Sequence, residues 1–366
     1  MEKLKYTRVE ECCEILDSMR IPITASDRKE GKYPYYGANG IQDYVNDYIF
    51  DDELVLLAED GGNFGSKEKP IAYRVSGKCW VNNHAHVLKP KEEIDVDYLC
   101  YSLMFYKVDG MINGATRKKL TQTAMKKMKI PLRNIVEQKK IVQQLNKIIE
   151  IREKAKKELN LLDNLIQARF IEVFGNPESN SKGWKECSLS EKLNVLGGYA
   201  FKSDQFDENI GIPVLRIGNI NAGYFKPVNM VYWKEDSKLA KYTLYPGDLV
   251  MSLTGTVGKD DYGNVCILGN DYEMYYLNQR NAKLEIKKDI NKYYLSQLLR
   301  FKQIKKKLTG ISRGVRQANI SNKDILNLVI PIPPMELQEQ FAAFVQQVNK
   351  SKFVIHKFLY CTTHNT

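Results

Sequence analysis

KIPLRNIVEQKKIVQQL (Lys129–Leu145) has a second, diverged copy in the same chain, VIPIPPMELQEQFAAFV (Val329–Val345). The two stretches are 200 residues apart and align without a gap, so the Ile-Pro pair and the glutamine that follows it fall on the same positions. After the proline, apolar residues recur in both copies at the spacing of an amphipathic helix. The chain is therefore expected to begin the same kind of helix twice.

The repeat extends upstream of these helix starts. Between 112–131 and 312–331 the offset stays at 200 residues, and farther upstream it drifts, as loops of different length would make it drift. The matched segments keep the same order in both halves: 33–41 with 212–220, 53–65 with 248–258, 80–88 with 276–284, and 98–105 with 294–301. Such internal similarity predicts duplication of one unit, a β-rich domain followed by a helix.

The predicted fold class is α+β, with two duplicated β-rich domains that are each followed by a long helix. Short β-branched and aromatic runs broken by Gly, Asn and Asp predict short strands and loops. Apolar residues at helical spacing predict shorter helices at 97–106 and 293–304. The expected boundaries are 1–133 for the first domain, 134–175 for the first long helix, 176–333 for the second domain and 334–366 for the second helix.

The first long helix is predicted over Ile135–Phe174, which contains no Gly or Pro and is followed by Gly-Asn-Pro. In both long helices apolar residues recur every 3.5 positions, and a basic residue, Arg152 or Lys352, interrupts the pattern at the same place. This period is typical of a coiled coil, so we expect the two helices to pair. Each helix leaves its domain in the same way, so an antiparallel pairing would put the domains at opposite ends with approximate two-fold symmetry, and this is the pairing that we expect. The alternative is two unrelated helices in one globule. The predicted pairing residues are Ile141, Leu145, Ile148, Leu159 and Leu162 in the first helix and Phe341, Val345, Val348, Ile355 and Leu359 in the second.

The composition limits the classes of partner. A formal net charge of +11 on 366 residues favours a polyanion, either nucleic acid or an acidic membrane surface. Seven widely spaced cysteines without a C-x-x-C pair disfavour a disulfide framework or a zinc ribbon and favour a reducing cytoplasm. No apolar segment predicts a signal peptide or a membrane span. We therefore expect a soluble, cytoplasmic protein.

Partial matches to catalytic motifs are each incomplete. GNPES (175–179) lacks the second proline and the aromatic residue of the amino-methyltransferase motif, and GTVGK (255–259) is too short for a phosphate-binding loop. LEIK (284–287) resembles part of a nuclease metal site, but its counterpart in the first repeat has no glutamate. His84 and His86 share one strand face without a third ligand nearby in the sequence. We therefore predict no catalytic, cofactor-binding or metal-ligating residues.

Taken together, these segments resemble the specificity subunits of type I restriction–modification systems. GKYPYYGANGIQDYVNDYIFDDELVLLAEDGG (31–62), GGYAFKSDQF (197–206) and IPIPPMELQEQ (330–340) are similar to patterns of the family's target-recognition domains. VFGNPESNSKGW (173–184) is similar to the family's junction between the first long helix and the second domain. The resemblance covers nearly the whole chain.

The resemblance implies a subunit without its own active site. Each domain would read one half of a bipartite sequence in double-stranded DNA. The paired helices would act as a spacer and as a docking surface for two modification (methyltransferase) subunits, which restriction (endonuclease/translocase) subunits would join. The assembled complex would be a DNA adenine methyltransferase and an ATP-dependent endonuclease. One departure is the second helix, which we expect to have about 25 residues against about 40 in the first, where the family usually has a longer one.

Two basic segments without acidic residues, 117–129 and 301–316, lie at matching points of the repeat. A single basic segment is usually a solvated face, but duplication favours phosphate contacts, which position a protein on DNA without reading its sequence. Base reading needs amide and guanidinium groups, which we expect in the loops where the copies differ. The predicted DNA-contacting residues are Asn63, Lys67, Arg117, Lys118 and Lys119 in the first half and Lys259, Gln279, Arg280, Lys305, Lys306, Lys307, Arg313 and Arg316 in the second. Because the two domains differ, the target is expected to be asymmetric.

Two other classes of function remain open on the sequence. One is a DNA-acting enzyme that works alone, which the incomplete motifs disfavour. The other is a coiled-coil structural or RNA-binding protein, which would need neither of the Gly- and Asn-rich recognition patterns.

Overall fold

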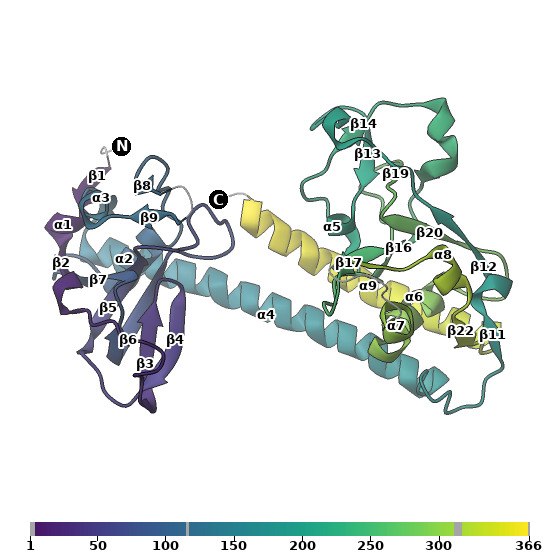
Figure 1. Ribbon diagram of the computed structural model, residues 1–366, viewed down its shortest axis with the longest axis horizontal. Helices are drawn as coiled ribbons and strands as arrows, with labels where there is room; N and C mark the ends of the chain where they lie inside the picture. The colour runs from purple at the N-terminus through teal and green to yellow at the C-terminus, as the bar shows by residue number, and fades with distance from the viewer. Residues whose placement is uncertain (1–3, 115–116, 311–316, 365–366) are drawn as a thin grey trace. The chain divides into compact units, whose positions relative to one another are not determined.

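The computed structural model describes residues 4–114, 117–310 and 317–364, and the chain folds into two compact units, residues 1–153 and 154–366. Each unit holds one β-rich domain, and the 40-residue helix α4 (Ile135–Phe174) begins in the first unit and ends in the second (Figure 1). No helix among the described residues has both the length and the apolar composition that a membrane crossing needs.

The first domain consists of strands and short helices that precede α4. Its strands are β1 (Lys5–Arg8), β2 (Cys13–Ile15), β3 (Glu30–Gly37), β4 (Gly40–Val45), β5 (Phe50–Ala58), β6 (Ala72–Val81), β7 (Ala85–Pro90), β8 (Ile112–Asn113), β9 (Lys119–Leu120) and β10 (Lys129–Leu132). Its helices are α1 (Val9–Cys12), α2 (Val96–Met104), α3 (Gln122–Lys126) and the 3-10 turn η1 (Asp17–Met19).

The main sheet of the first domain has the strand order β2-β7-β5-β6-β3-β4. Neighbouring strands are antiparallel except β3 and β6, which are parallel. Side chains alternate between the two faces of a strand. Leu54 and Leu56 of β5 therefore pack into one apolar cluster, and Val55 and Leu57 pack into another, which α2 covers. The central strand is thus buried on both faces.

The second unit holds the end of α4, the second domain and the second long helix. Its strands are β11 (Glu186–Ser188), β12 (Leu193–Gly197), β13 (Ile212–Leu215), β14 (Tyr232–Trp233), β15 (Thr243–Leu244), β16 (Leu249–Ser252), β17 (Thr254–Thr256), β18 (Val265–Ile267), β19 (Tyr275–Leu277), β20 (Asn281–Ile286), β21 (Gln317–Asn319) and β22 (Val329–Pro331). Its helices are α5 (Ile217–Ile220), α6 (Lys292–Arg300), α7 (Lys302–Thr309), α8 (Asn322–Leu326) and α9 (Met335–His364), with the 3-10 turns η2 (Leu189–Glu191), η3 (Ser203–Gln205) and η4 (Ser237–Tyr242).

Two four-stranded sheets, ordered β12-β20-β16-β18 and β14-β13-β19-β15, form most of the second domain. Its largest apolar cluster joins the first of these sheets and α6 to both long helices. Members of the cluster include Leu249, Leu284, Leu295, Phe170 of α4 and Phe341 of α9. The core of the second domain therefore extends onto the helix pair.

The duplication predicted from the sequence is confirmed by the strand register. Tyr35 pairs with Trp80 in the parallel β3–β6 ladder, and the residues at matching positions, Val214 and Tyr276, pair in the parallel β13–β19 ladder. Likewise, β1 pairs antiparallel with β10, and β11 with β22. The two domains share these pairings although their sequences have diverged.

The sequence alignment is one residue out of register in one strand. Matching position 53 with 248 gives an offset of 195 residues. In the structure the N–H of Glu59 donates to the carbonyl of His84 (2.9 Å), and the N–H of Leu253 donates to that of Arg280 (2.8 Å). Glu59 therefore corresponds to Leu253, an offset of 194. An apolar strand that is buried on both faces shows no alternation from which its register could be read.

One of the two shorter helices differs from its prediction. The helix predicted at 97–106 is confirmed as α2. The one predicted at 293–304 is divided into α6 and α7, because Phe301 between them has an extended backbone (ψ 128°). The ring of Phe301 packs on Phe170 of α4 with centroids 4.8 Å apart. Burying this ring against α4 favours the break.

The long helix α4 has the predicted bounds, whereas α9 is longer than expected. Gly175, which ends α4, has a φ of 80°, a left-handed conformation that glycine adopts readily. α9 has 30 residues, so the expected length of about 25 is wrong. The sequence after Lys352 contains no Gly or Pro up to His364 and remains helical.

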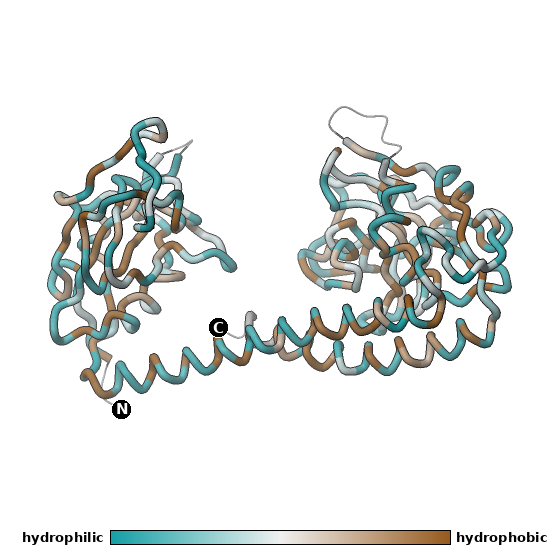
Figure 2. Tube along the Cα trace, turned by 90° about the horizontal axis from the view of Figure 1, so that it is seen from below, coloured by the Kyte–Doolittle hydropathy of each residue, from teal (hydrophilic) through white to brown (hydrophobic). Residues whose placement is uncertain are grey.

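α9 packs antiparallel on the C-terminal part of α4. Phe341, near the start of α9, contacts Phe170 and Phe174, near the end of α4, with ring centroids 5.5 and 5.3 Å apart. Farther along α9, the Lys352 ammonium lies 2.5 Å from the Asp163 carboxylate. The predicted antiparallel pairing is confirmed here, and Figure 2 shows apolar residues recurring along both helices.

The predicted pairing residues differ in burial. Those that are buried or packed against the core of the second unit are Leu159, Leu162, Phe341, Val345 and Val348. Those that are half-buried or exposed are Leu145, Ile148, Ile355 and Leu359, and their pairing stays a prediction. Ile141 packs on the core of the first domain, and its place in the helix pair stays a prediction. The helix pattern alone does not show which stripe residues contact the preceding domain.

Candidate nucleic-acid interface

Two tight turns occupy matching places in the two domains. Between β6 and β7, the side-chain oxygen of Asn82 accepts a hydrogen bond from the N–H of His84 (2.8 Å). Between β19 and β20, the side-chain oxygen of Asn278 accepts one from the N–H of Arg280 (3.3 Å). Asparagine side chains that bond to the backbone two residues on stabilise such turns. Both domains therefore hold this turn in the same way.

The turns carry polar side chains that are free to bind. Asn83, Gln279 and Arg280 are exposed, and within the described part of the chain none of their side chains forms a hydrogen bond or an ion pair. His84 is half-buried, with Nδ1 3.3 Å from an Asp60 carboxylate oxygen. An unpaired amide or guanidinium group keeps its hydrogen-bonding capacity for a ligand.

Each turn lies beside the end of a central strand. A segment from farther along the chain, at Leu120 or Ile320, returns to this strand end and is called the returning segment. In the first domain the N–H of Leu120 donates to the carbonyl of Glu59 (2.7 Å), whose own N–H bonds the turn residue His84. In the second domain the N–H of Ile320 donates to the carbonyl of Leu253 (2.8 Å), and the N–H of Leu253 donates to the carbonyl of the turn residue Arg280. We call this arrangement of turn, strand end and returning segment the backbone frame of each domain.

Basic side chains lie beside the backbone frame of the first domain. Arg117 pairs with Asp60 (2.5 Å) and Lys119 with Glu59 (3.0 Å), yet these two basic side chains are 60% and 50% exposed. Lys118 between them is exposed. The structure therefore brings the predicted Arg117–Lys119 segment next to the turn.

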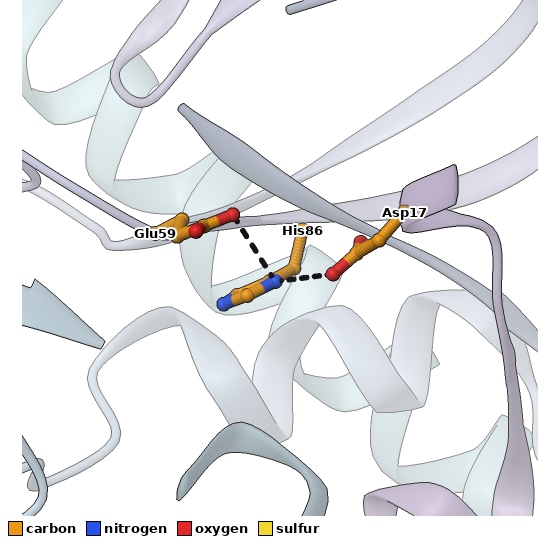
Figure 3. Close-up of side chains that lie close together, drawn as sticks. All are labelled: Asp17, Glu59 and His86. Carbon is orange, nitrogen blue, oxygen red and sulfur yellow. Dashed lines mark hydrogen bonds and ion pairs between the residues drawn. The ribbon is translucent and has the colours of Figure 1, made fainter. Parts of the chain in front are cut away.

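A buried polar network supports this backbone frame (Figure 3). His86 Nδ1 lies 2.7 Å from an Asp17 carboxylate oxygen, and His86 Nε2 lies 2.9 Å from the carbonyl oxygen of Leu120. Arg20 donates to the Glu59 carboxylate (2.6 Å) and to the backbone carbonyl of Asp17 (2.9 Å). The network therefore links η1, β7 and the end of β5 to the returning segment.

The two carboxyl groups of this network are stabilised as anions. Burial alone would raise the pKa of Asp17, but hydrogen bonds from His86 and Gln122 contribute to holding it below its ordinary value. Burial opposes ionisation of Glu59 as well, and the hydrogen bond from Arg20 helps to hold that pKa low. Hydrogen bonds and nearby charges together thus outweigh desolvation at both carboxyl groups.

Asp17, Glu59 and His86 also have the composition of a metal-ligand set, with ligand atoms within 4.8 Å of one another. Each group already has a protein partner. Arg20 supplies positive charge at Glu59, and Gln122 donates to Asp17 (2.9 Å). The arrangement is therefore that of an ion-pair network that supports the turn.

The backbone frame of the second domain has different surroundings. At the register positions that match the three network residues, the chain has Gly197, Leu253 and Ala282. Beside Arg280 opens a shallow hollow of about 460 Å³. Its lining residues are Ile217, Asn221, Thr254, Gly255, Thr256, Asp261 and Arg280. The duplicated frames thus present different chemistry to a ligand.

The other predicted DNA-contacting residues lie in several places. Lys67, Lys259, Lys306 and Lys307 are exposed, Asn63 is half-buried, and Arg313 and Arg316 lie outside the described residues. Lys305 is only 7% exposed, and its ammonium group bonds the Asp260 carboxylate and, at 2.6 Å, the Asn264 side-chain oxygen. We therefore correct its assignment: Lys305 stabilises the second domain and does not face a phosphate. It lies on the inner face of α7, which charge alone does not reveal.

Sequence reasoning selected only one of the two turns. Gln279 and Arg280 were predicted to contact DNA, whereas Asn83 and His84 were missed. The signal was present, because aligning WVNNHAHVL (80–88) with YLNQRNAKL (276–284) puts the two pairs on the same positions.

Comparisons with known proteins agree with this architecture. The family model for the type I restriction modification DNA specificity domain matches residues 1–161 and 181–359. A putative type I restriction enzyme specificity subunit of Haemophilus influenzae is 27% identical over 353 residues, which cover 94% of this chain and 87% of the relative. The MjaVIII specificity subunit of Methanocaldococcus jannaschii is 26% identical over 380 residues, covering 95% and 86%.

Solved structures share the fold. The type I restriction-modification S subunit from M. genitalium has a TM-score of 0.58 at 15% identity, with 99% of this chain and 94% of that chain covered. A chain from a study of complex assembly and conformational transition of the type I R-M system has a TM-score of 0.51 at 16% identity, covering 100% and 96%.

Two copies of one β-rich domain, each with a polar turn and joined through long helices, define a two-domain reader of DNA sequence. The family match identifies it further: the chain belongs to the type I restriction modification DNA specificity family. It is a specificity subunit of a type I restriction–modification system, with a recognition role and no active site of its own.

Proposed function

We propose that the two domains read two different half-sequences of one bipartite DNA target. The observation that carries this proposal is that the domains share a backbone frame but differ in the side chains on it. At matching positions the first domain has Asn83 and His84, and the second has Gln279 and Arg280. Two different sets of donors and acceptors favour two different sequences, so the target is asymmetric.

Phosphate contacts hold each domain on the DNA in this proposal. The candidates are exposed lysines: Lys118 and Lys119 in the segment that returns to the backbone frame of the first domain, and Lys306 and Lys307 on α7. The Lys119 side chain is 50% exposed although its ammonium group pairs with Glu59, so it stays accessible to a phosphate. Such contacts add affinity on every sequence and weaken as salt rises.

The chain also acts, we propose, as the scaffold of a larger complex. Two modification (methyltransferase) subunits bind it, and restriction (endonuclease/translocase) subunits join them. Supporting this, a structurally similar chain comes from work on complex assembly of the type I R-M system. We further propose a cytoplasmic location, which the unpaired state of the six described cysteines supports.

Methylome sequencing tests the recognition role. The chain is co-expressed with a modification subunit in a host without other adenine methylation. We expect one motif made of two unlike half-sequences separated by a fixed gap, and no such motif when the chain is omitted. A palindromic motif, or methylation that persists without the chain, would contradict the proposal.

A further inference from the structure

The two matched turns have what base reading requires: exposed hydrogen-bonding side chains on a fixed backbone. We propose that the connections β6–β7 and β19–β20 are the base-reading elements of the two domains. Gln279 and Arg280 then contact base edges in one half-site, and Asn83 and His84 contact them in the other. This inference rests on the proposed function and adds to it the elements that determine specificity.

The side chains on the turns match the edges of particular bases. A guanidinium group can donate two hydrogen bonds to the O6 and N7 acceptors of guanine, and an amide can pair with the N6 and N7 atoms of adenine. Arg280 therefore fits guanine, and Gln279 and Asn83 fit adenine. The three side chains lack intramolecular partners in the described structure, so binding a base breaks no existing side-chain hydrogen bond.

The turns are rigid before DNA arrives. Asn82 and Asn278 close them through side-chain hydrogen bonds, and a neighbouring strand bonds each turn at the carbonyl of His84 or Arg280. A group that is already ordered loses little conformational entropy on binding, which favours discrimination between similar sequences. Asn82 and Asn278 are thus positioning residues, and the residues that follow them make the contacts.

The surroundings of the two turns explain how one frame serves two sequences. In the first domain His84 lies against Asp60, which Arg117 also contacts. In the second domain Arg280 lines an open hollow with Asn221 and Thr254 among its walls. The first turn therefore has two charged neighbours, whereas the guanidinium group of Arg280 faces an open hollow whose walls include Asp261.

The experiment uses the complex of this chain with its modification subunits. After methylome sequencing gives the wild-type motif, affinities are measured for duplexes that each carry one changed base pair. We expect Arg280→Ala to reduce discrimination at one or two base pairs of one half-site from about tenfold or more to less than about threefold. The other half-site keeps its full discrimination. Arg280→Lys, which keeps the charge but not the two parallel donors, is expected to do the same.

The first turn gives the reciprocal test. Asn83→Ala and His84→Ala are expected to flatten discrimination only in the half-site that Arg280→Ala leaves intact. Discrimination is a ratio of affinities in one preparation, so a partly unfolded sample does not mimic the effect.

The matched control is the double substitution Lys306→Ala and Lys307→Ala, which is expected to lower affinity evenly on all duplexes. The inference is overturned if the turn variants discriminate like the wild type, or if they lower affinity evenly like this control. If the wild-type complex itself recognises no bipartite motif, the proposed function fails, and that outcome is distinct from failure of the turns.

Discussion

Gln138 and Gln338 stand 200 residues apart and make the same hydrogen bonds in the two units. Each side-chain oxygen accepts from the backbone N–H of the residue that caps a short helix, Asp95 before α2 or Asn291 before α6, and both distances are 2.8 Å. Each side-chain nitrogen donates to a carbonyl of the chain just before its own helix (2.8 Å). Both glutamines are fully buried. A long helix is thereby fixed to its domain through one amide group.

Replacing either glutamine with methionine should destabilise one unit only. Methionine has a similar volume but leaves the partly buried N–H of Asp95 or Asn291 without its acceptor, which costs up to about 1–3 kcal/mol. The chain has three tryptophans, Trp80 in the first unit and Trp184 and Trp233 in the second. Urea unfolding can therefore be followed separately, by Trp80 in a Trp184→Phe/Trp233→Phe background and by the other two in a Trp80→Phe background. Equal shifts in both units on either substitution would contradict the assignment.

The basic face of α7 should contribute affinity without specificity. Replacing Lys306 and Lys307 with alanine is expected to weaken DNA binding on all sequences and to reduce the slope of log K against log salt by up to about two. Lys305→Met is the matched control, because this buried ammonium bonds Asp260 and Asn264. It should lower stability and leave the slope unchanged. Salt titrations of binding by the assembled complex measure the slope for both variants, and urea unfolding of the second unit measures the stability of Lys305→Met. An equal loss of slope for Lys305→Met would show that Lys305 faces DNA after all.

The ion pair within the helix pair should respond asymmetrically to mutation. Lys352 is 9% exposed, whereas nearly half of the Asp163 side chain is exposed. Asp163→Ala leaves a largely buried ammonium unpaired and is expected to cost about 1–3 kcal/mol. Adding Lys352→Met, which removes that charge, should restore most of the loss. Urea unfolding of the second unit measures the cycle, and a double variant as unstable as Asp163→Ala would exclude this account.

The first unit should lose stability in acid through its buried carboxyl groups. The pKa values of Asp17 and Glu59 are held below their ordinary values of 3.8 and 4.5. A lowered folded-state pKa stabilises the fold above the unfolded-state pKa, and this contribution is lost as pH falls through the folded-state value. The free energy of unfolding of the first unit is therefore expected to fall below about pH 5.

Asp17→Asn and Glu59→Gln should flatten this acid dependence. The second unit serves as the internal control, because it has Gly197 and Leu253 at the matching positions. Urea midpoints from the tryptophan-specific backgrounds, measured between about pH 3 and pH 7, give the two slopes. An unchanged slope in the first unit of these variants would mean that other carboxyl groups cause the loss.

The sequence showed more about organisation than about sites. The repeat at an offset of 200 residues, the bounds of α4 and the apolar helix faces follow from residue spacing, because spacing decides which residues share a helix face. The antiparallel direction of the pairing followed from the duplication of the domain–helix unit. Of the backbone frame, only the turn of the second domain was predicted from the sequence. The frame of the first domain forms from Glu59, His84 and Leu120, which lie far apart in the chain and meet through backbone hydrogen bonds that leave no mark on residue type.

By itself the sequence determined that the chain is a duplicated, two-domain protein, since local periodicity and internal similarity survive in one dimension, and its resemblance to type I specificity subunits predicted a reader of DNA. The tertiary structure decided which residues can act. Lys305 and Lys306 are neighbours of the same charge, but the turn of the helix buries one against Asn264 and leaves the other exposed. Likewise, Ile141 shares a stripe with Leu159, but it docks on the first domain because packing depends on what the fold brings opposite each side chain.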